Sequence, residues 1–327
     1  MGDNVPVHNP AGLGLDAFSL RSQGFSGVQI LEFCAARGVG VVHFSEPRLL
    51  GSTEPAALRD VRACAEGLGI ALEVGMLSIC PGATIFNAAA GSAEAQLSQA
   101  IDLAVALGSP LVRSVVGSFR DRVRPGGIEQ RIEETLAVIA AVRSRASDAG
   151  VKLAVENHAG DMQARELKML VEQAGPDLVG VCLDAGNAFW AMEDPRVALE
   201  TLASFVLTSH TRDSAVRATA DGAEVAWTRM GDGNIRIDQY LDRLRALRPD
   251  LPLMLEIIVM PEPRSLPYRN DQFRAGYPRM TESEFQQLVT LVDTARPVPL
   301  PSGAVDAAAE LANVEASLQW AKDYLNG

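Results

Sequence analysis

The chain has few of the residues that bind soft metals or cross-link secreted proteins. Its 327 residues include four cysteines, Cys34, Cys64, Cys80 and Cys182, and no two of them stand close together. This spacing excludes a zinc finger or a redox pair of the usual type. We therefore expect four free thiols and a location in the reducing cytoplasm.

The chain also has no run of basic residues and no apolar segment at its start. The net charge is −12, and the basic residues are scattered. This balance disfavours nucleic-acid and anionic membrane partners. The first residues, MGDNVPVHNP, are polar and contain proline, unlike a signal peptide or a membrane span. We predict a flexible arm over 1–12 and assign no role to His8.

A glycine-rich nucleotide loop is missing as well. Gly12 and Gly14 lie at the start of the first predicted strand, whereas a dinucleotide-binding turn follows such a strand. No other phosphate-cradling loop stands out. A free sugar or a glycoside is therefore a better candidate ligand than a sugar phosphate.

Eight strand patterns alternate with helical patterns along the chain. Continuous apolar runs of this kind are typical of strands buried on both faces, and eight βα units predict an α/β fold, a (β/α)8 TIM barrel. The hydrophobic fraction of 47% suits one large core. We predict one catalytic barrel domain over 13–296, followed over 297–327 by a linker and a C-terminal helical extension, the helix at about 305–325. The predicted strands are 13–18, 39–44, 70–76, 111–116, 152–156, 179–184, 205–210 and 253–258.

Two connections are longer than ordinary βα loops, which run about 2 to 6 residues. They cover 212–234, after the seventh strand, and 260–278, after the eighth. Both should overhang the barrel mouth. Their aromatic and cationic residues, Trp227, Arg264, Tyr268 and Arg269, favour a substrate lid, and an oligomer contact is an equal alternative.

The last four strands each end in a hard metal ligand. These residues are Glu156, Asp184, His210 and Glu256. In a barrel the carboxyl ends of the strands converge on one face. Three carboxylates brought together there would repel one another and would be costly to bury. The pattern therefore predicts one divalent metal ion.

The donor types indicate which ion and which chemistry to expect. Three carboxylates and one imidazole favour Mn²⁺, with Mg²⁺ or Co²⁺ as alternatives. Four protein ligands leave about two octahedral positions for a hydroxy-carbonyl substrate. Such a centre can polarise a carbonyl and stabilise an enediolate.

The motifs around these residues resemble those of the xylose-isomerase-like sugar isomerase/epimerase superfamily. They are Glu-Asn-His at 156–158, Leu-Asp-Ala-Gly-Asn at 183–187, Ser-His-Thr-Arg-Asp at 209–213, Gly-Asp-Gly-Asn at 231–234, and the Leu-Glu of the eighth strand. The resemblance spans about 13–296 and is specific in the second half. It implies the same metal ligands.

At two positions this chain differs from subfamilies of this superfamily, and these differences disfavour membership of those subfamilies. Ketose 3-epimerases of the superfamily usually carry a histidine where this chain has Asn187. The abasic-site endonucleases of the superfamily need three zinc ions and more histidines than the four present here, and this chain has Asn187 and Asn234 where such ligands would stand.

His158 is our candidate general base, because the extended chain beyond Glu156 should place both side chains on one side. The alternatives are that His158 only orients a metal ligand, or that Glu156 itself takes the proton. Glu256 is the candidate for returning the proton. The candidate substrate-binding residues are His43, Glu46, Arg113, Asn187 and Arg212. The two arginines could instead neutralise nearby carboxylates.

We therefore predict a metal-dependent isomerase or epimerase that acts on a sugar or keto-sugar derivative. If the enolate expels a group, the same site becomes a lyase, such as the C-glycoside deglycosidases and oxo-sugar decarboxylases of the superfamily. A non-catalytic sugar-binding barrel is the alternative of another class. The long loops and the last helix predict a homo-oligomer, with a second small subunit as a further option.

Overall fold

The structure is a computed structural model that describes residues 12–327. Apart from Gly12, the arm predicted over 1–12, with His8, lies outside the described residues.

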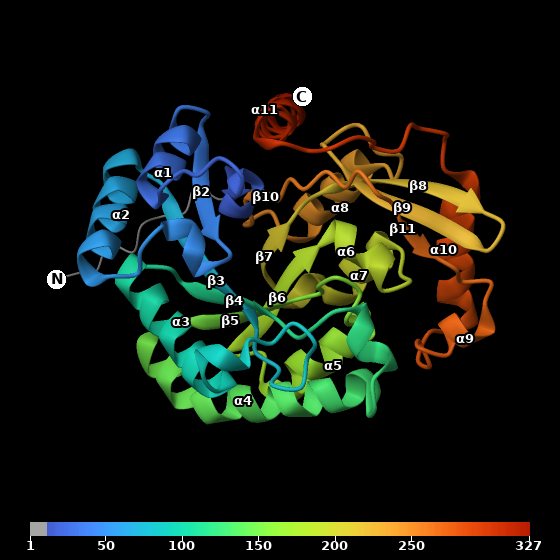
Figure 1. The fold of residues 1–327 in the computed structure, drawn as a ribbon, viewed down its shortest axis with the longest axis horizontal. Coiled ribbons are helices and arrows are strands. Elements are labelled where there is room, and N and C mark those ends of the chain that lie inside the picture. The colour runs from blue at the N-terminus through green and yellow to red at the C-terminus, as the bar shows by residue number, and fades with distance from the viewer. Residues whose placement is uncertain (1–11) are drawn as a thin grey trace.

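Eight parallel strands form the central sheet (Figure 1), in the order β10-β1-β2-β3-β4-β5-β6-β7. The two ends of this sheet meet where Thr211, just after β7, pairs with Leu255 of β10. The Thr211 N–H donates to the Met254 carbonyl over 2.8 Å, and the Glu256 N–H donates to the Thr211 carbonyl over 3.1 Å. The strands are β1 (Leu13–Asp16), β2 (Val39–Phe44), β3 (Ala71–Ser78), β4 (Leu111–Val115), β5 (Lys152–Glu156), β6 (Val179–Asp184), β7 (Val206–His210) and β10 (Leu253–Leu255). The predicted (β/α)8 barrel is confirmed.

Strand ends differ from the prediction by more than one residue at β1, β3 and β10, and β3 runs two residues further, to Ser78. β10 ends at Leu255, three residues earlier than predicted. The reason is that the next free N–H, that of Ile257, donates to the Ser19 hydroxyl over 2.9 Å and not to a neighbouring strand. β1 likewise ends at Asp16, because the Asp16 carboxylate accepts the N–H of Phe18 and begins a short 3₁₀ helix, η1 (Ala17–Leu20).

Helices surround the barrel and cover the outer face of its strands (Figure 1). The longest of them, α4, is followed by Gly150, whose φ of 67° suits a residue without a Cβ. No helix of residues 12–327 is both long and apolar enough to cross a membrane. The helices are α1 (Gly27–Ala35), α2 (Pro55–Leu68), α3 (Ala93–Leu107), α4 (Gly127–Ala149), α5 (Ala164–Ala174), α6 (Ala185–Trp190), α7 (Pro195–Leu202), α8 (Ile237–Leu247), α9 (Asp271–Arg274), α10 (Glu282–Thr294) and α11 (Ala307–Asn326).

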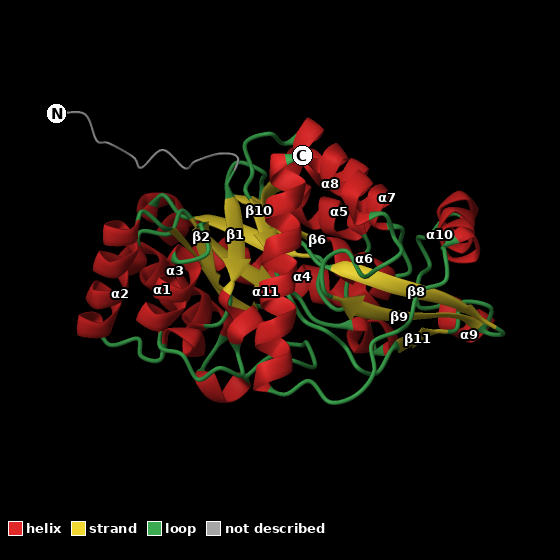
Figure 2. Cartoon of the chain, turned by 90° about the horizontal axis from the view of Figure 1, so that it is seen from above, coloured by secondary structure: helices red, strands yellow, loops and turns green. Residues whose placement is uncertain are grey.

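The two long connections contain regular structure that the sequence analysis left out. They form a separate three-stranded antiparallel sheet, in the order β11-β9-β8, which extends to one side of the barrel in Figure 2. Its strands are β8 (Asp213–Thr219), β9 (Gly222–Thr228) and β11 (Arg264–Leu266). We call it the lid sheet. The sequence analysis assigned no strands to these connections. β8 and β9 form a local hairpin, whereas β11 pairs with a strand about 40 positions away, and such pairing leaves no local signal.

The C-terminal helix α11 packs on the barrel of its own chain. Its Glu310 carboxylate accepts the N–H of Ser22, just after η1, over 2.9 Å. Its Ser317 hydroxyl accepts the N–H of Met230, in the loop after β9, over 3.1 Å. The helix therefore ties the first βα unit to the loop that follows the lid hairpin.

Candidate metal centre

The barrel brings the four predicted ligands together. Glu156, Asp184 and His210 are the last residues of β5, β6 and β7, and Glu256 follows β10 directly. One donor atom of each lies within 4.8 Å of the donor atoms of the other three. All four side chains are buried. Parallel register explains this, since Asp184 and His210 are paired neighbours on adjacent strands.

These separations suit a hard divalent ion. An octahedral ion with bonds of about 2.1 Å needs donors about 3.0 Å apart when adjacent and about 4.2 Å apart when opposite. The observed limit of 4.8 Å requires only a small contraction. Cys182 lies close to Glu156 and His210 as well, but burial raises the pKa of its thiol to about 12. Without a metal it is therefore a protonated thiol, and the set of three carboxylates and one imidazole is the group whose donors suit a hard ion.

Two buried arginines lie among the carboxylates. Arg212 donates through Nε to Asp184 Oδ2 over 2.8 Å and also forms an ion pair with Glu256. Arg113, on β4, pairs with Glu156. The two arginines thus neutralise the carboxylates in this arrangement, which is one of the alternatives that the sequence left open.

His210 uses both ring nitrogens within the cluster. Its Nδ1 lies 3.2 Å from carboxylate oxygens of both Glu156 and Glu256. Its Nε2 lies 3.1 Å from Asp16 Oδ2 and 3.0 Å from His43 Nδ1. Against the effect of burial, the carboxylates of Glu256 and Glu156 raise the pKa of His210 well above its usual range.

The charges of this cluster fit a divalent cation. When His43 and His210 are neutral, five buried carboxylates and two guanidinium groups leave an excess of three negative charges. Burial raises the pKa of Asp16 to about 6 and that of Asp184 to about 7, because a buried site disfavours their charged forms. A bound divalent ion would offset most of it and would face the Nδ1 lone pair of His210. The carboxyl groups are Asp16, Glu73, Glu156, Asp184 and Glu256, and the guanidinium groups are Arg113 and Arg212.

His158 lies beyond the end of β5, in a loop, so its place is set by hydrogen bonds and not by strand alternation. Its N–H donates to the Asp161 carboxylate over 2.9 Å. Its Nδ1 lies 2.9 Å from the carbonyl oxygen of Gly117. A carbonyl only accepts hydrogen bonds, so Nδ1 carries the proton and a neutral ring leaves the lone pair on Nε2. Burial lowers the pKa of His158, which keeps the ring neutral.

Of the other residues predicted to bind substrate, Asn187 and His43 contact the proposed metal ligands, and Glu46 does not. Asn187, on α6, donates to Glu156 Oε1 over 3.0 Å, and His43 adjoins His210. Glu46 is not joined to the cluster: its carboxylate pairs with the exposed Arg48.

Several residues of the site escaped the sequence analysis. Asp16 ends β1 as the four ligands end their strands, so the same positional signal could have found it. Asn157 joins β5 to β6, because its amide accepts the Asp184 N–H and donates to the Asp184 carbonyl. Glu73 accepts from Thr208 across the barrel, a contact that no local pattern predicts.

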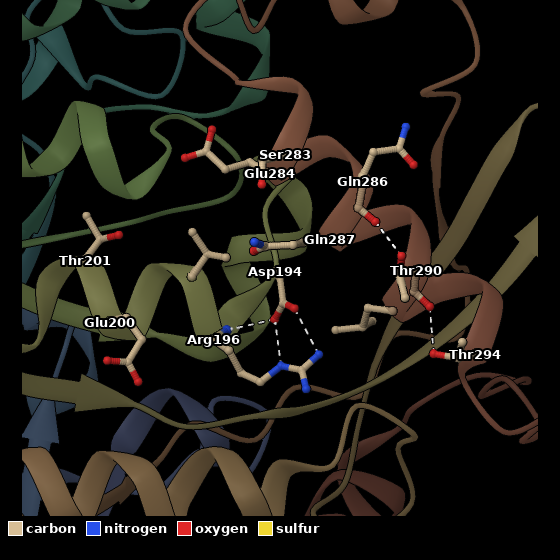
Figure 3. Close-up of a pocket in the computed structure, with 12 residues that line it drawn as sticks. Asp194, Arg196, Glu200, Thr201, Ser283, Glu284, Gln286, Gln287, Thr290 and Thr294 are labelled. Atoms are coloured by element: carbon tan, nitrogen blue, oxygen red, sulfur yellow. Dashed lines mark hydrogen bonds and ion pairs between the residues drawn. The ribbon is translucent and has the colours of Figure 1, made fainter.

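A wide surface groove lies away from these residues. Figure 3 shows it between α7 and α10, with a volume of about 950 Å³. None of the residues that line it belongs to the cluster, and two of its charged groups, Asp194 and Arg196, pair with each other. We therefore place the candidate site at the strand ends.

The fold and these strand ends define a barrel with an acidic candidate metal site, and comparison with known proteins gives its family. A sequence model of the xylose isomerase-like TIM barrel family matches residues 19–276, so the chain belongs to that family. The 3-oxo-isoapionate decarboxylase of Pectobacterium atrosepticum is 26% identical over 186 residues, which are 57% of this chain and 60% of the decarboxylase. This chain thus spans three fifths of the length of that curated relative.

Solved structures share the fold. The D-psicose 3-epimerase of Clostridium cellulolyticum, solved with D-tagatose, superimposes with a TM-score of 0.65 at 16% identity, over 96% of this chain and 99% of the epimerase. The IolI protein, solved with a bound zinc atom, gives 0.58 at 15% identity, over 88% and 100% of the two chains.

Proposed function

We propose that the chain is a divalent-metal-dependent enzyme that removes a proton next to the carbonyl of a sugar or keto-sugar derivative. The observation that carries this proposal is the pairing of a metal-type cluster with a histidine whose Nε2 is free to accept a proton. Epimerase and decarboxylase relatives support the class of chemistry, since both can pass through an enolate.

Glu156, Asp184, His210 and Glu256 would hold the ion. We infer Mn²⁺, with Mg²⁺ or Co²⁺ as alternatives, because three of the four donors are carboxylates. When bound, the ion would act as a Lewis acid toward the substrate carbonyl.

His158 is the base that this arrangement favours. Both oxygens of Glu156 already have partners, Asn187 on one side and Arg113 with His210 on the other, so Glu156 is better suited to hold the ion. The His158 ring is fixed through Nδ1 and offers Nε2. General base catalysis of this kind contributes typically about 10²- to 10⁴-fold.

Glu256 is the second group that can move a proton. Against the effect of burial, Arg212 and His210 lower the pKa of Glu256 to about 2, so it starts ionised and must receive a proton before it can return one. Delivery of the proton by His158 to the neighbouring carbon, with a proton moving between the two oxygens, gives isomerisation. Epimerisation requires that the proton pass from His158 to Glu256, which then delivers it to the opposite face of the same carbon.

A lyase is the second candidate, and the decarboxylase relative favours it. In an elimination, the enolate formed by proton removal would expel a group from the next carbon. In a decarboxylation, the enolate would form by loss of carbon dioxide. A change in mass between substrate and product separates the two candidates, because isomers keep the mass and elimination products do not.

The experiment that tests the shared chemistry combines metal analysis with isotope exchange. Purified protein is measured by elemental mass spectrometry before and after chelation, and a panel of keto sugars is incubated with it in heavy water. We expect about one divalent ion per chain and deuterium in at least one substrate. Absence of bound metal and of any response to added metal would point to the non-catalytic sugar-binding barrel.

Assembly stays a separate proposal. We expect a homo-oligomer, with a second small subunit as an alternative, and size-exclusion chromatography with light scattering measures its mass directly.

A further inference from the structure

Arg264, the first residue of β11, lies in an unusual environment for a cation. Its guanidinium carbon is 3.5 Å from the ring centroid of Phe119 and 4.7 Å from that of Trp190. Its Nε is buried and has no hydrogen-bond partner. Among the arginines of residues 12–327, only Arg264 is shielded from solvent in this way and yet lacks any oxygen partner. This is unexpected in a chain with 41 acidic and 29 basic residues.

The register of the lid sheet turns Arg264 toward the candidate site. Arg264 pairs directly with Val225 of β9, so both side chains lie on the same face. Trp227 is two residues after Val225 and therefore shares this face. Arg264 and Trp227 thus project from one side of the lid sheet.

A continuous series of ring contacts joins that face to the carboxylate cluster. The Trp190 and Trp227 rings are stacked, with centroids 4.5 Å apart and planes 12° from parallel. The Arg212 guanidinium carbon lies 4.0 Å from the Trp227 centroid. Because Arg212 pairs with Asp184 and Glu256, two indole rings and the Arg212 guanidinium connect Arg264 to the candidate metal ligands.

The surroundings of the Arg264 guanidinium group contain no negatively charged hydrogen-bond acceptor from residues 12–327. Trp190 Nε1 is a second buried donor without a partner, and it belongs to a ring that contacts Arg264. Aromatic faces offset part of the cost of burying a guanidinium group, but they accept none of its directed hydrogen bonds. Burial lowers the pKa of Arg264 to about 10, so the group stays charged at neutral pH.

We propose that Arg264 and Trp190 form a subsite for a carboxylate of the substrate, which makes the substrate an acidic oxo-sugar whose carboxylate lies at the end remote from its hydroxy-carbonyl group. This proposal rests on the proposed function and adds the substrate class to it. A carboxylate suits the subsite better than a phosphate, because proteins commonly hold phosphate with helix N-termini or several cationic donors. Here the unpartnered donors come from one guanidinium and one indole.

The subsite also bears on the fate of the enolate. An ionised carboxylate paired with a fixed cation is stabilised in that form. Loss of this group as carbon dioxide would forfeit the ion pair. A carboxylate at Arg264 is therefore retained through the reaction, which favours proton return over decarboxylation of that group.

Two sugars with the same hydroxy-ketone end test the subsite. They are 5-keto-D-gluconate, which has a carboxylate at its other end, and L-sorbose, which has a hydroxymethyl group there. Binding to the manganese-loaded, full-length protein is followed by tryptophan fluorescence, since Trp190 and Trp227 line the path, and by calorimetry. We expect the carboxylate to strengthen binding about tenfold or more. L-Sorbose carrying a terminal phosphate forms a third arm, which should gain less.

Arg264→Gln should remove the preference for 5-keto-D-gluconate and leave the affinity for L-sorbose unchanged. Arg264→Lys should restore only part of it, because an ammonium group lacks the planar fork. Arg269→Gln is the matched control: Arg269 belongs to the same lid segment, but it is exposed and donates to the Thr219 carbonyl. This control should bind both sugars as the unmodified chain does.

Several outcomes would overturn the subsite. They are equal binding of the two sugars, no binding of either, a preference that persists in Arg264→Gln because the carboxylate sits at the metal, or a stronger gain from phosphate. Loss of the subsite alone leaves metal-dependent deuterium exchange intact. Failure of that exchange with a preserved carboxylate preference would sink the proposed function instead.

Discussion

Replacement of His158 separates catalysis from metal binding more sharply than any other change in this site. His158 contacts Gly117 and Asp161 but belongs to none of the groups of possible metal ligands. His158→Ala should therefore keep the metal and lose turnover. If Nε2 is the general base, the rate of proton removal should fall about 10²- to 10⁴-fold. That loss corresponds to about 3 to 5 kcal/mol in the activation free energy.

A second variant distinguishes a chemical role from a structural one. In His158→Asn the amide Nδ2 can still donate to the Gly117 carbonyl, as Nδ1 does now, but no atom can act as a base. If the histidine only positions the loop, His158→Asn should work normally and His158→Ala should not. If it is the base, both should fail alike.

The assay measures metal content by elemental mass spectrometry and deuterium uptake into the best keto sugar of the panel. Glu156→Gln is the reference for the opposite behaviour, because it should lose metal and exchange together. Normal exchange in His158→Asn would refute the assignment of His158 as base. Loss of metal in His158→Ala would show that its role is to support the ligands.

Three further changes test other parts of the structure. His210→Ala should abolish metal binding, because the set of four proposed ligands loses its only imidazole, and this is measured by metal content after dialysis. Asp16→Asn should weaken metal affinity about 10- to 100-fold, as loss of a carboxylate that orients a ligating histidine does; titration in a metal buffer measures this, and unchanged affinity would remove Asp16 from the site. Burial raises the pKa of Glu193 from 4.5, its value in the unfolded chain, to about 8 in the folded chain. The folded chain therefore binds this proton more tightly, so the contribution of Glu193 to stability is present below pH 4.5 and is lost as the pH rises toward 8. Glu193→Gln should therefore flatten the fall in the free energy of unfolding between pH 5 and 8, and an unchanged slope in denaturant titrations would contradict the shift.

Local pattern in the sequence determined the barrel and the positions of the ligands. A strand buried on both faces must be apolar throughout, so the polar residue that ends it marks the mouth of the barrel. For Glu156, Asp184 and His210 this signal is read from a few neighbouring residues, and the topology then brings them together. The signal was equally present at Asp16, where the analysis did not use it.

Tertiary structure alone decided how these groups are paired and what covers them. Arg212 bridges two strand ends, and Glu73 accepts from Thr208 over a separation of 135 residues. Such contacts depend on side-chain packing across the barrel and leave no periodic trace along the chain. The same holds for the lid sheet, where pairing of Arg264 with Val225 sets which way that arginine faces. The sequence by itself therefore determined the fold and the candidate ligands, because both follow from the alternation of apolar and polar residues. Only the folded chain showed that Arg264 is an unpaired cation beside the barrel mouth, because the partners of a charged group depend on distances in space and not on separation along the chain.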